Sequence, residues 1–146
     1  MDSAGYKVLL LLHILSVIVA FGPAFAVPVL NTRARKAGGG APEVLASLVS
    51  GNTLKIYGPA TLLAGIFGCG LVGMSEKIWT FSQAWVSVAL LLWIFVLALQ
   101  FGLLAPAEKR AAGGDEGAAR LQSMFTGIQH LLLVALIGVM IFKPGL

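Results

Sequence analysis

The chain has 146 residues, of which 58% are hydrophobic and only 11% are charged. A soluble domain carries about 25% charged residues, so this composition excludes an ordinary water-soluble globule. The formal net charge is +4, but the basic residues stand in short segments between apolar runs. They form no basic face interleaved with aromatic residues, which excludes a nucleic-acid-binding surface. The length suits a single domain that covers residues 1–146.

Four long apolar runs follow one another along the chain. A bilayer core about 30 Å thick is crossed by about 20 helical residues, and each run is near that length. The runs are rich in Leu, Ala and Val and do not alternate with polar residues, which favours helices over strands. We therefore predict an all-α integral membrane protein, an up-down bundle of four transmembrane helices in a lipid bilayer. The predicted spans are residues 8–30, 56–74, 84–104 and 122–142.

The first apolar run has two interpretations. The small triplet Ala24-Phe25-Ala26 resembles the cleavage site of a signal peptide. However, the apolar stretch continues to Leu30, and basic residues that would hinder export follow directly. We expect an uncleaved first membrane helix.

Basic residues distribute unequally between the two sides of the predicted spans. Cytoplasmic loops of membrane proteins carry an excess of Lys and Arg. Loops one and three hold seven of the ten basic residues, so we expect both loops in the cytoplasm and both termini outside. The tryptophans Trp79 and Trp85 flank the short outer loop, as interfacial residues do. The seven are Arg33, Arg35, Lys36, Lys55, Lys109, Arg110 and Arg120, and the other three are Lys7, Lys77 and Lys143.

Loop one contains a short helical pattern. It begins at Pro42-Glu43, after three glycines, and ends at Gly51-Asn52. Two interpretations stay open: the segment lies along the membrane surface, or it extends the second membrane helix into the cytoplasm. Loop three, residues 106–117, is predicted to be a polar and mobile connection.

Small residues form stripes on the predicted helices. In lipid, helices associate through close packing, which small side chains permit. One interpretation of the stripes is packing inside the bundle. The other is a docking face for a membrane protein partner or a second copy of the chain. The second helix carries Thr61, Gly65, Cys69 and Gly73 at four-residue spacing, and the first carries Ser16, Ala20 and Ala24.

Two histidines lie inside the predicted spans, His13 in the first and His130 in the fourth. Ionisable groups within a membrane are functional candidates. A haem b held by both is disfavoured, because their predicted depths differ by roughly 10 Å at 1.5 Å per helical residue. Two interpretations of His13 remain: it is the single ligand of a tetrapyrrole, or it is hydrogen bonded to a neighbouring helix. For His130 a structural or proton-handling role is favoured over ligation.

Other catalytic chemistry has no candidate residues. The predicted spans contain no Asp or Glu, and the chain has no Cys/His cluster of the kind that binds zinc. It also lacks a phosphate-binding glycine loop and a GxSxG motif. We therefore assign no catalytic residue and no metal ligand.

The whole chain resembles a bacterial family known only as predicted integral membrane proteins. The resemblance rests on KVLLLLHILSVIVAFGPAFAVPVL in helix one, LKIYGPATLLAGIFG in helix two, LLAPAEKR after helix three and the closing IGVMIFKPGL. More distantly, the outline is similar to the HemJ type of protoporphyrinogen oxidase and to copper resistance protein D. Similarity to the oxidases implies that His13 holds haem. The oxidases have a lysine in helix three and an Asn-Glu pair early in helix four. The equivalent positions of this chain hold Ala89 and Thr126-Gly127 instead. For copper, the chain has no outer Met/His cluster.

These observations predict a non-catalytic membrane protein that acts as an accessory or self-associating subunit through its small-residue faces. The alternative is a haem- or porphyrin-binding redox protein that uses His13. An outward-facing stripe would favour the first function, and a cavity beside His13 with aromatic walls would favour the second.

Overall fold

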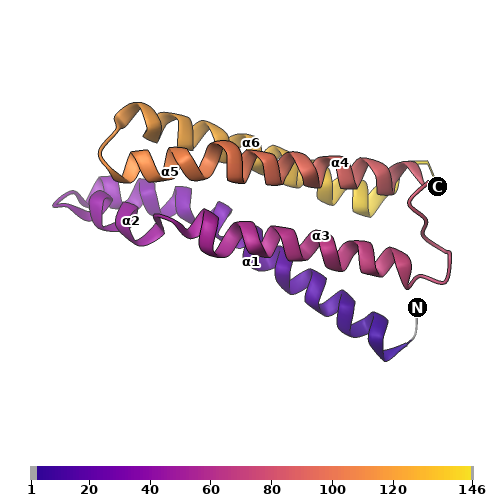
Figure 1. The fold of residues 1–146 in the computed structure, drawn as a ribbon. Coiled ribbons are helices and arrows are strands. Elements are labelled where there is room, and N and C mark those ends of the chain that lie inside the picture. The colour runs from indigo at the N-terminus through magenta and orange to yellow at the C-terminus, as the bar shows by residue number, and fades with distance from the viewer. Residues whose placement is uncertain (1–2, 146) are drawn as a thin grey trace.

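The computed structural model describes residues 3–145, and every regular element in that range is helical (Figure 1). Within the described range, four continuous helical stretches are long and apolar enough to cross a membrane. They confirm the all-α prediction and the expected number of long apolar helices. The elements are α1 (Ala4–Ala37), α2 (Ala41–Val49), the π-helical turn η1 (Thr53–Tyr57), α3 (Gly58–Gly73), α4 (Ala84–Leu99), the π-helical turn η2 (Gln100–Leu104), α5 (Ala105–Ala112) and α6 (Glu116–Phe142).

Polar side chains cap the N-terminal ends of α1 and α6. The Ser3 side chain accepts a hydrogen bond from the Tyr6 backbone N–H at the start of α1, and Asp115 does the same for Ala118 at the start of α6. Such caps satisfy backbone donors that the first turn leaves free. At the other end, α1 stops at Gly38, whose φ of 65° suits glycine. The caps explain why α1 and α6 extend beyond the predicted spans 8–30 and 122–142.

The prediction of a mobile loop over residues 106–117 is wrong. The third long apolar helix continues through η2 and α5 as far as Ala112, and only residues 113–115 connect it to α6. Pro106 does not end the helix, because it occupies the first turn of α5, directly after a π-helical turn. A proline has no backbone N–H, but the N–H groups in the first turn of a helix have no acceptor within that helix, so the proline removes no hydrogen bond there.

The short helix predicted in loop one is confirmed as α2. It is followed by η1 and α3 within the apolar stretch Ala41–Gly73, after a break at Ser50, which is extended, and Gly51, whose φ is 80°. Figure 1 shows α2 continuing the direction of α3 alongside the end of α1. Of the two interpretations, this arrangement matches an extension of the second membrane helix.

The helices pack as two pairs. Helix α1 contacts α3 most extensively, and α4 contacts α6, with smaller contacts between the pairs (Figure 1). The core consists mainly of small and aliphatic side chains where the pairs meet. Helix α1 and the α4–α6 pair diverge toward the end that holds the start of α1 and the end of α6 (Figure 1). The core residues are Ala20, Phe21, Ala60, Val96 and Leu133.

Candidate functional site

The imidazole of His13 is held by one hydrogen bond to the neighbouring helix. Its Nδ1 lies 2.7 Å from the backbone carbonyl oxygen of Ala64 on α3. A carbonyl oxygen only accepts, so Nδ1 carries the proton and donates it. In the neutral form of the ring, Nε2 is then the nitrogen that can accept a hydrogen bond. No other contact of the His13 ring nitrogens is present in the described chain.

The absence of a side chain at Gly68 makes room for this ring. A Cβ atom at Gly68 would lie 3.3 Å from Cε1 of His13. One of the two interpretations of His13 was a hydrogen bond to a neighbouring helix, and this bond is present. The close approach of α1 and α3 provides the carbonyl.

A cavity of about 220 Å³ adjoins His13. Its walls come from α1, α3, the α3–α4 loop, α4 and α6, and they are almost entirely apolar. On α1 the lining positions are Tyr6, Leu10, His13, Val17 and Phe21, which recur at helical spacing on one face. Ser16 and Ala20 are not among the residues that line this cavity.

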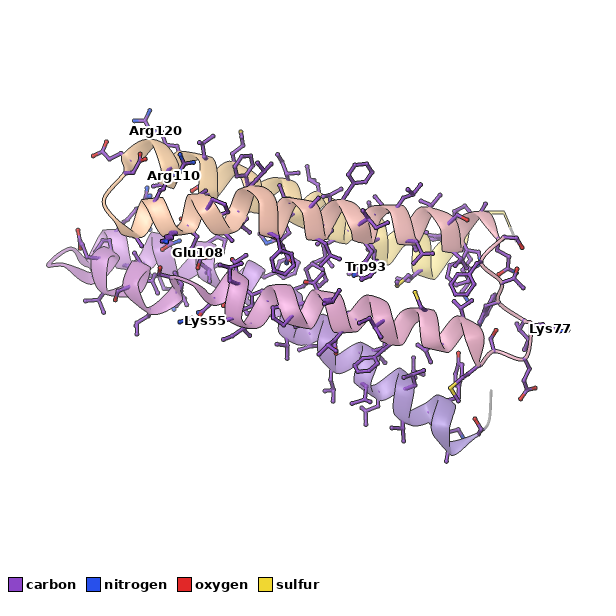
Figure 2. The ribbon with its side chains drawn as sticks, in the orientation of Figure 1. Lys55, Lys77, Trp93, Glu108, Arg110 and Arg120 are labelled. Carbon is purple, nitrogen blue, oxygen red and sulfur yellow. The ribbon has the colours of Figure 1, made fainter. Side chains whose placement is uncertain are left out.

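All three tryptophans of the chain line this cavity. Trp93 extends from α4 toward α3 (Figure 2), and its Nε1 donates to the carbonyl oxygen of Thr61 at 2.8 Å. Trp85 is buried, and its Nε1 has no hydrogen-bond partner in the described structure. The cavity wall thus offers one free donor from Trp85 and one free acceptor from His13.

The outer rim of the cavity is held by the loop between α3 and α4. The Ser75 hydroxyl is buried, donates to the Val72 carbonyl at 2.7 Å and accepts from the Trp79 N–H at 2.9 Å. The Trp79 ring meets the Trp85 ring edge to face, with centroids 5.3 Å apart. The Lys143 ammonium lies 3.9 Å from the centre of the Trp79 ring, a cation–π contact that fixes the C-terminal segment on this rim.

His130 lies outside this cavity. Its ring packs against Phe25 of α1, with centroids 4.9 Å apart. Phe25 follows His13 by twelve residues, or about 18 Å of helix at 1.5 Å per residue. The structure therefore does not bring the two predicted histidines together.

The small-residue stripes fall into different environments. Thr61 and Gly65 pack inside the bundle, where the Trp93 ring covers Gly65. Cys69 lines the cavity, while Gly73 is exposed with no atom near its Cβ position. On α1, Ala20 is buried in the core and Ser16 is half-buried, and the side chain of Ala24 lies outside the described part of the structure.

Sequence reasoning missed a second group of buried polar residues. Gln100, Glu108 and Gln129 are buried and line a separate cavity of about 60 Å³. Glu108 was overlooked because the predicted span ended at residue 104. The spacing of Gln100, Leu104 and Glu108, four residues apart, is the signal that could have placed them on one helix face.

Only the geometry of the site bears on its function, because the comparisons with known proteins found no match: no family model, curated protein or solved structure matches the chain. Among the described residues, no group of three or more His, Cys, Asp or Glu side chains is placed to hold a metal ion.

Proposed function

We propose that the protein is a multi-pass membrane protein whose four spans run up and down and bind a small, oxygen-bearing aromatic ligand beside His13. The membrane part of the proposal is supported by the outer surface of the helices. Large apolar side chains there are widely exposed, for example Leu131 at 72% and Phe95 at 61%. Soluble monomers rarely expose large contiguous apolar surfaces, whereas lipid tails would cover them.

The orientation follows from charge. Figure 2 shows Arg110 and Arg120 at the end of the molecule opposite Lys77. Because cytoplasmic loops carry the excess of basic residues, we propose that the α1–α2 and α5–α6 connections are cytoplasmic and that both termini are outside.

Cysteine labelling of whole cells tests this orientation. In a Cys69→Ser background, Ser82→Cys should react with a membrane-impermeant maleimide, because Ser82 is exposed in the α3–α4 loop. Ala37→Cys and Ala112→Cys should react only after the cells are opened. Labelling of the latter two in intact cells, with Ser82→Cys protected, would reverse the orientation.

The observation that carries the ligand proposal is the pair of unmet hydrogen-bonding groups on the cavity wall. His13 Nε2 is an acceptor and Trp85 Nε1 is a donor. A quinol matches both: one ring hydroxyl donates to His13 Nε2, and a second ring oxygen accepts from Trp85 Nε1. A buried donor without a partner is costly, so such a ligand would satisfy Trp85 Nε1 while it uses the acceptor of His13.

The size of the cavity favours one ring. A dry cavity of about 150 Å³ holds benzene. Pockets for drug-sized ligands measure about 300–1,000 Å³. The cavity beside His13, at about 220 Å³, therefore suits a single substituted ring.

A haem fits this cavity poorly. His13 has the tautomer that histidine ligands of metals adopt, with Nδ1–H donating to a carbonyl. However, a tetrapyrrole has four rings in one plane and needs more room than one substituted benzene. His130, the other histidine, packs against Phe25 instead of facing the cavity.

Subunit docking through the small-residue stripe has less support. At Thr61 and Gly65 the stripe is covered by α4 of the same chain, because the Trp93 side chain of α4 packs against both residues. This occupancy supports the internal-packing interpretation. Only Gly73 leaves an open position on the stripe, so we propose ligand binding ahead of an accessory or self-associating role.

Tryptophan fluorescence measures this binding directly, since every tryptophan borders the cavity. We expect tetramethylhydroquinone, added to the purified protein in lipid nanodiscs, to quench the emission saturably. His13→Leu should raise the dissociation constant about tenfold, the equivalent of ~1.4 kcal/mol. Trp85→Phe keeps the ring and removes the donor, so it should also weaken binding.

His130→Leu is the matched control, because it removes the other intramembrane histidine and leaves the cavity intact. Its dissociation constant should equal that of the unmodified protein. Linear, non-saturating quenching, or equal affinity for the His13 and His130 variants, would reject the quinol site. A Soret band in the absorption spectrum of the purified protein would indicate that the ligand is a tetrapyrrole and not a quinol.

A further inference from the structure

A second, polar cavity lies where the two helix pairs meet near the basic end of the molecule. Its volume is about 60 Å³, and a single water needs about 10–15 Å³, so it can hold a small ion together with water. The lining side chains come from the α1–α3 side and from the α4–α6 side. This cavity shares no residue with the one beside His13.

Three side chains in this cavity are deeply buried without hydrogen-bond partners. Gln100 is 0% exposed, and neither its Oε1 nor its Nε2 has a partner in the described structure. Gln129 is 4% exposed and Glu108 is 5% exposed, with Oε1 and Oε2, respectively, unpartnered. Burying such groups is costly unless something satisfies them, and a carboxylate is the most costly of the three. Three unpartnered oxygen atoms therefore converge on one cavity.

Both π-helical turns border this cavity. Thr53 and Tyr57 belong to η1, and Gln100 and Leu104 belong to η2. In each turn the backbone bond spans five residues: the Gly58 N–H donates to the Thr53 carbonyl, and the Ala105 N–H donates to the Gln100 carbonyl. π-Helical turns are rare and frequently mark functional sites. Here two such turns contact each other across one polar cavity.

Among the described residues, no basic side chain forms an ion pair with the Glu108 carboxyl group. It lies on the side of α5 that faces the α1–α3 pair (Figure 2). Lys55 follows the cavity residue Thr53 in η1, but its side chain is exposed. Lys109 and Arg110, the next residues on α5, are exposed as well.

We propose that this cavity is a binding site for a small monovalent cation of the Na⁺ class. Hard cations prefer oxygen ligands, and the cavity offers the Glu108 carboxylate and the amide oxygens of Gln100 and Gln129. Thr53 and Thr126 add hydroxyl groups to the lining. One carboxylate balances one positive charge, which matches a monovalent ion better than a divalent one. The Nε2 of Gln100 is left to donate to water that shares the cavity.

Thermal unfolding of the purified protein in detergent tests the site. At constant ionic strength, exchange of choline chloride for sodium chloride should raise the Tm by about 3–8 °C, because an ion that binds only the folded state stabilises it. Glu108→Gln and Gln100→Leu should each remove most of this Na⁺-dependent rise. Radioactive ²²Na⁺ binding should show one saturable site that both substitutions weaken at least about tenfold.

Glu116→Gln is the matched control, since it makes the same charge change at an exposed position in the first turn of α6. It should keep the full Na⁺-dependent rise. An equal Tm in sodium and choline would show that the cavity holds only water or that Glu108 is protonated, and either result overturns the proposal. A rise that Glu108→Gln leaves unchanged would also overturn it. Because His13 lines the other cavity, His13→Leu should leave ²²Na⁺ binding intact even if the quinol site fails its own test.

Discussion

Gly65→Leu is expected to destabilise the folded protein by about 3 kcal/mol, the upper end of the usual range for overpacking. A Cβ atom at Gly65 would overlap the indole ring of Trp93. That ring cannot simply rotate away, because its Nε1 donates to the Thr61 carbonyl one helical turn earlier. The substitution would push α3 and α4 apart and open the wall of the His13 cavity. Chemical or thermal unfolding in detergent, with tryptophan emission as a second signal, would measure both effects.

Two substitutions on the same helix serve as controls. Gly73→Leu makes the same change on the same small-residue stripe, where no atom lies within 4 Å of the Cβ position. Leu63→Phe enlarges a side chain that is 44% exposed. Both should alter stability by less than about 0.5 kcal/mol, as exposed substitutions usually do. Equal losses at Gly65 and Gly73 would contradict the close packing of α3 against Trp93.

Leu133→Ala is expected to cost about 2–4 kcal/mol. Leu133 is 1% exposed and belongs to the core that joins the two helix pairs. Its truncation leaves a cavity whose walls lose their packing contacts, and Leu→Ala changes in cores typically cost about 2–5 kcal/mol. In a membrane protein, packing of this kind matters more than transfer from water, because lipid is as apolar as the core.

Leu131→Ala is the control for this experiment. Leu131 is on the same helix, two residues away, but is 72% exposed. If that face meets lipid, the truncated side chain leaves no cavity, and the loss should stay below about 1 kcal/mol. A loss at Leu131 as large as that at Leu133 would indicate that another protein surface covers the outer face of α6.

The hydrogen bonding of His13 depends on a contact between residues that are far apart in the sequence. The sequence identified His13 as a candidate ligand of a tetrapyrrole or as a group hydrogen bonded to a neighbouring helix. It did not indicate that the Ala64 carbonyl is the hydrogen-bond partner, because the two residues are brought together only where α1 crosses α3. The same crossing decides the tautomer of His13, and hence that Nε2 acts as an acceptor. The free donor of Trp85 also depends on how α4 packs and has no signature in the sequence.

The sequence by itself determined the features that arise from local composition: four apolar helices, the short helix that begins near Pro42-Glu43 and the concentration of basic residues in two connections. These follow from the length of each apolar run and from residues that start or stop helices within a few positions. Only the tertiary structure decided which faces are covered. It buried Gln100, Glu108 and Gln129 around one cavity and placed every tryptophan around another. The physical reason is that an almost uniformly apolar helix has no polar face to reveal its inner side, so the orientation of its few polar groups is set by packing against the other helices.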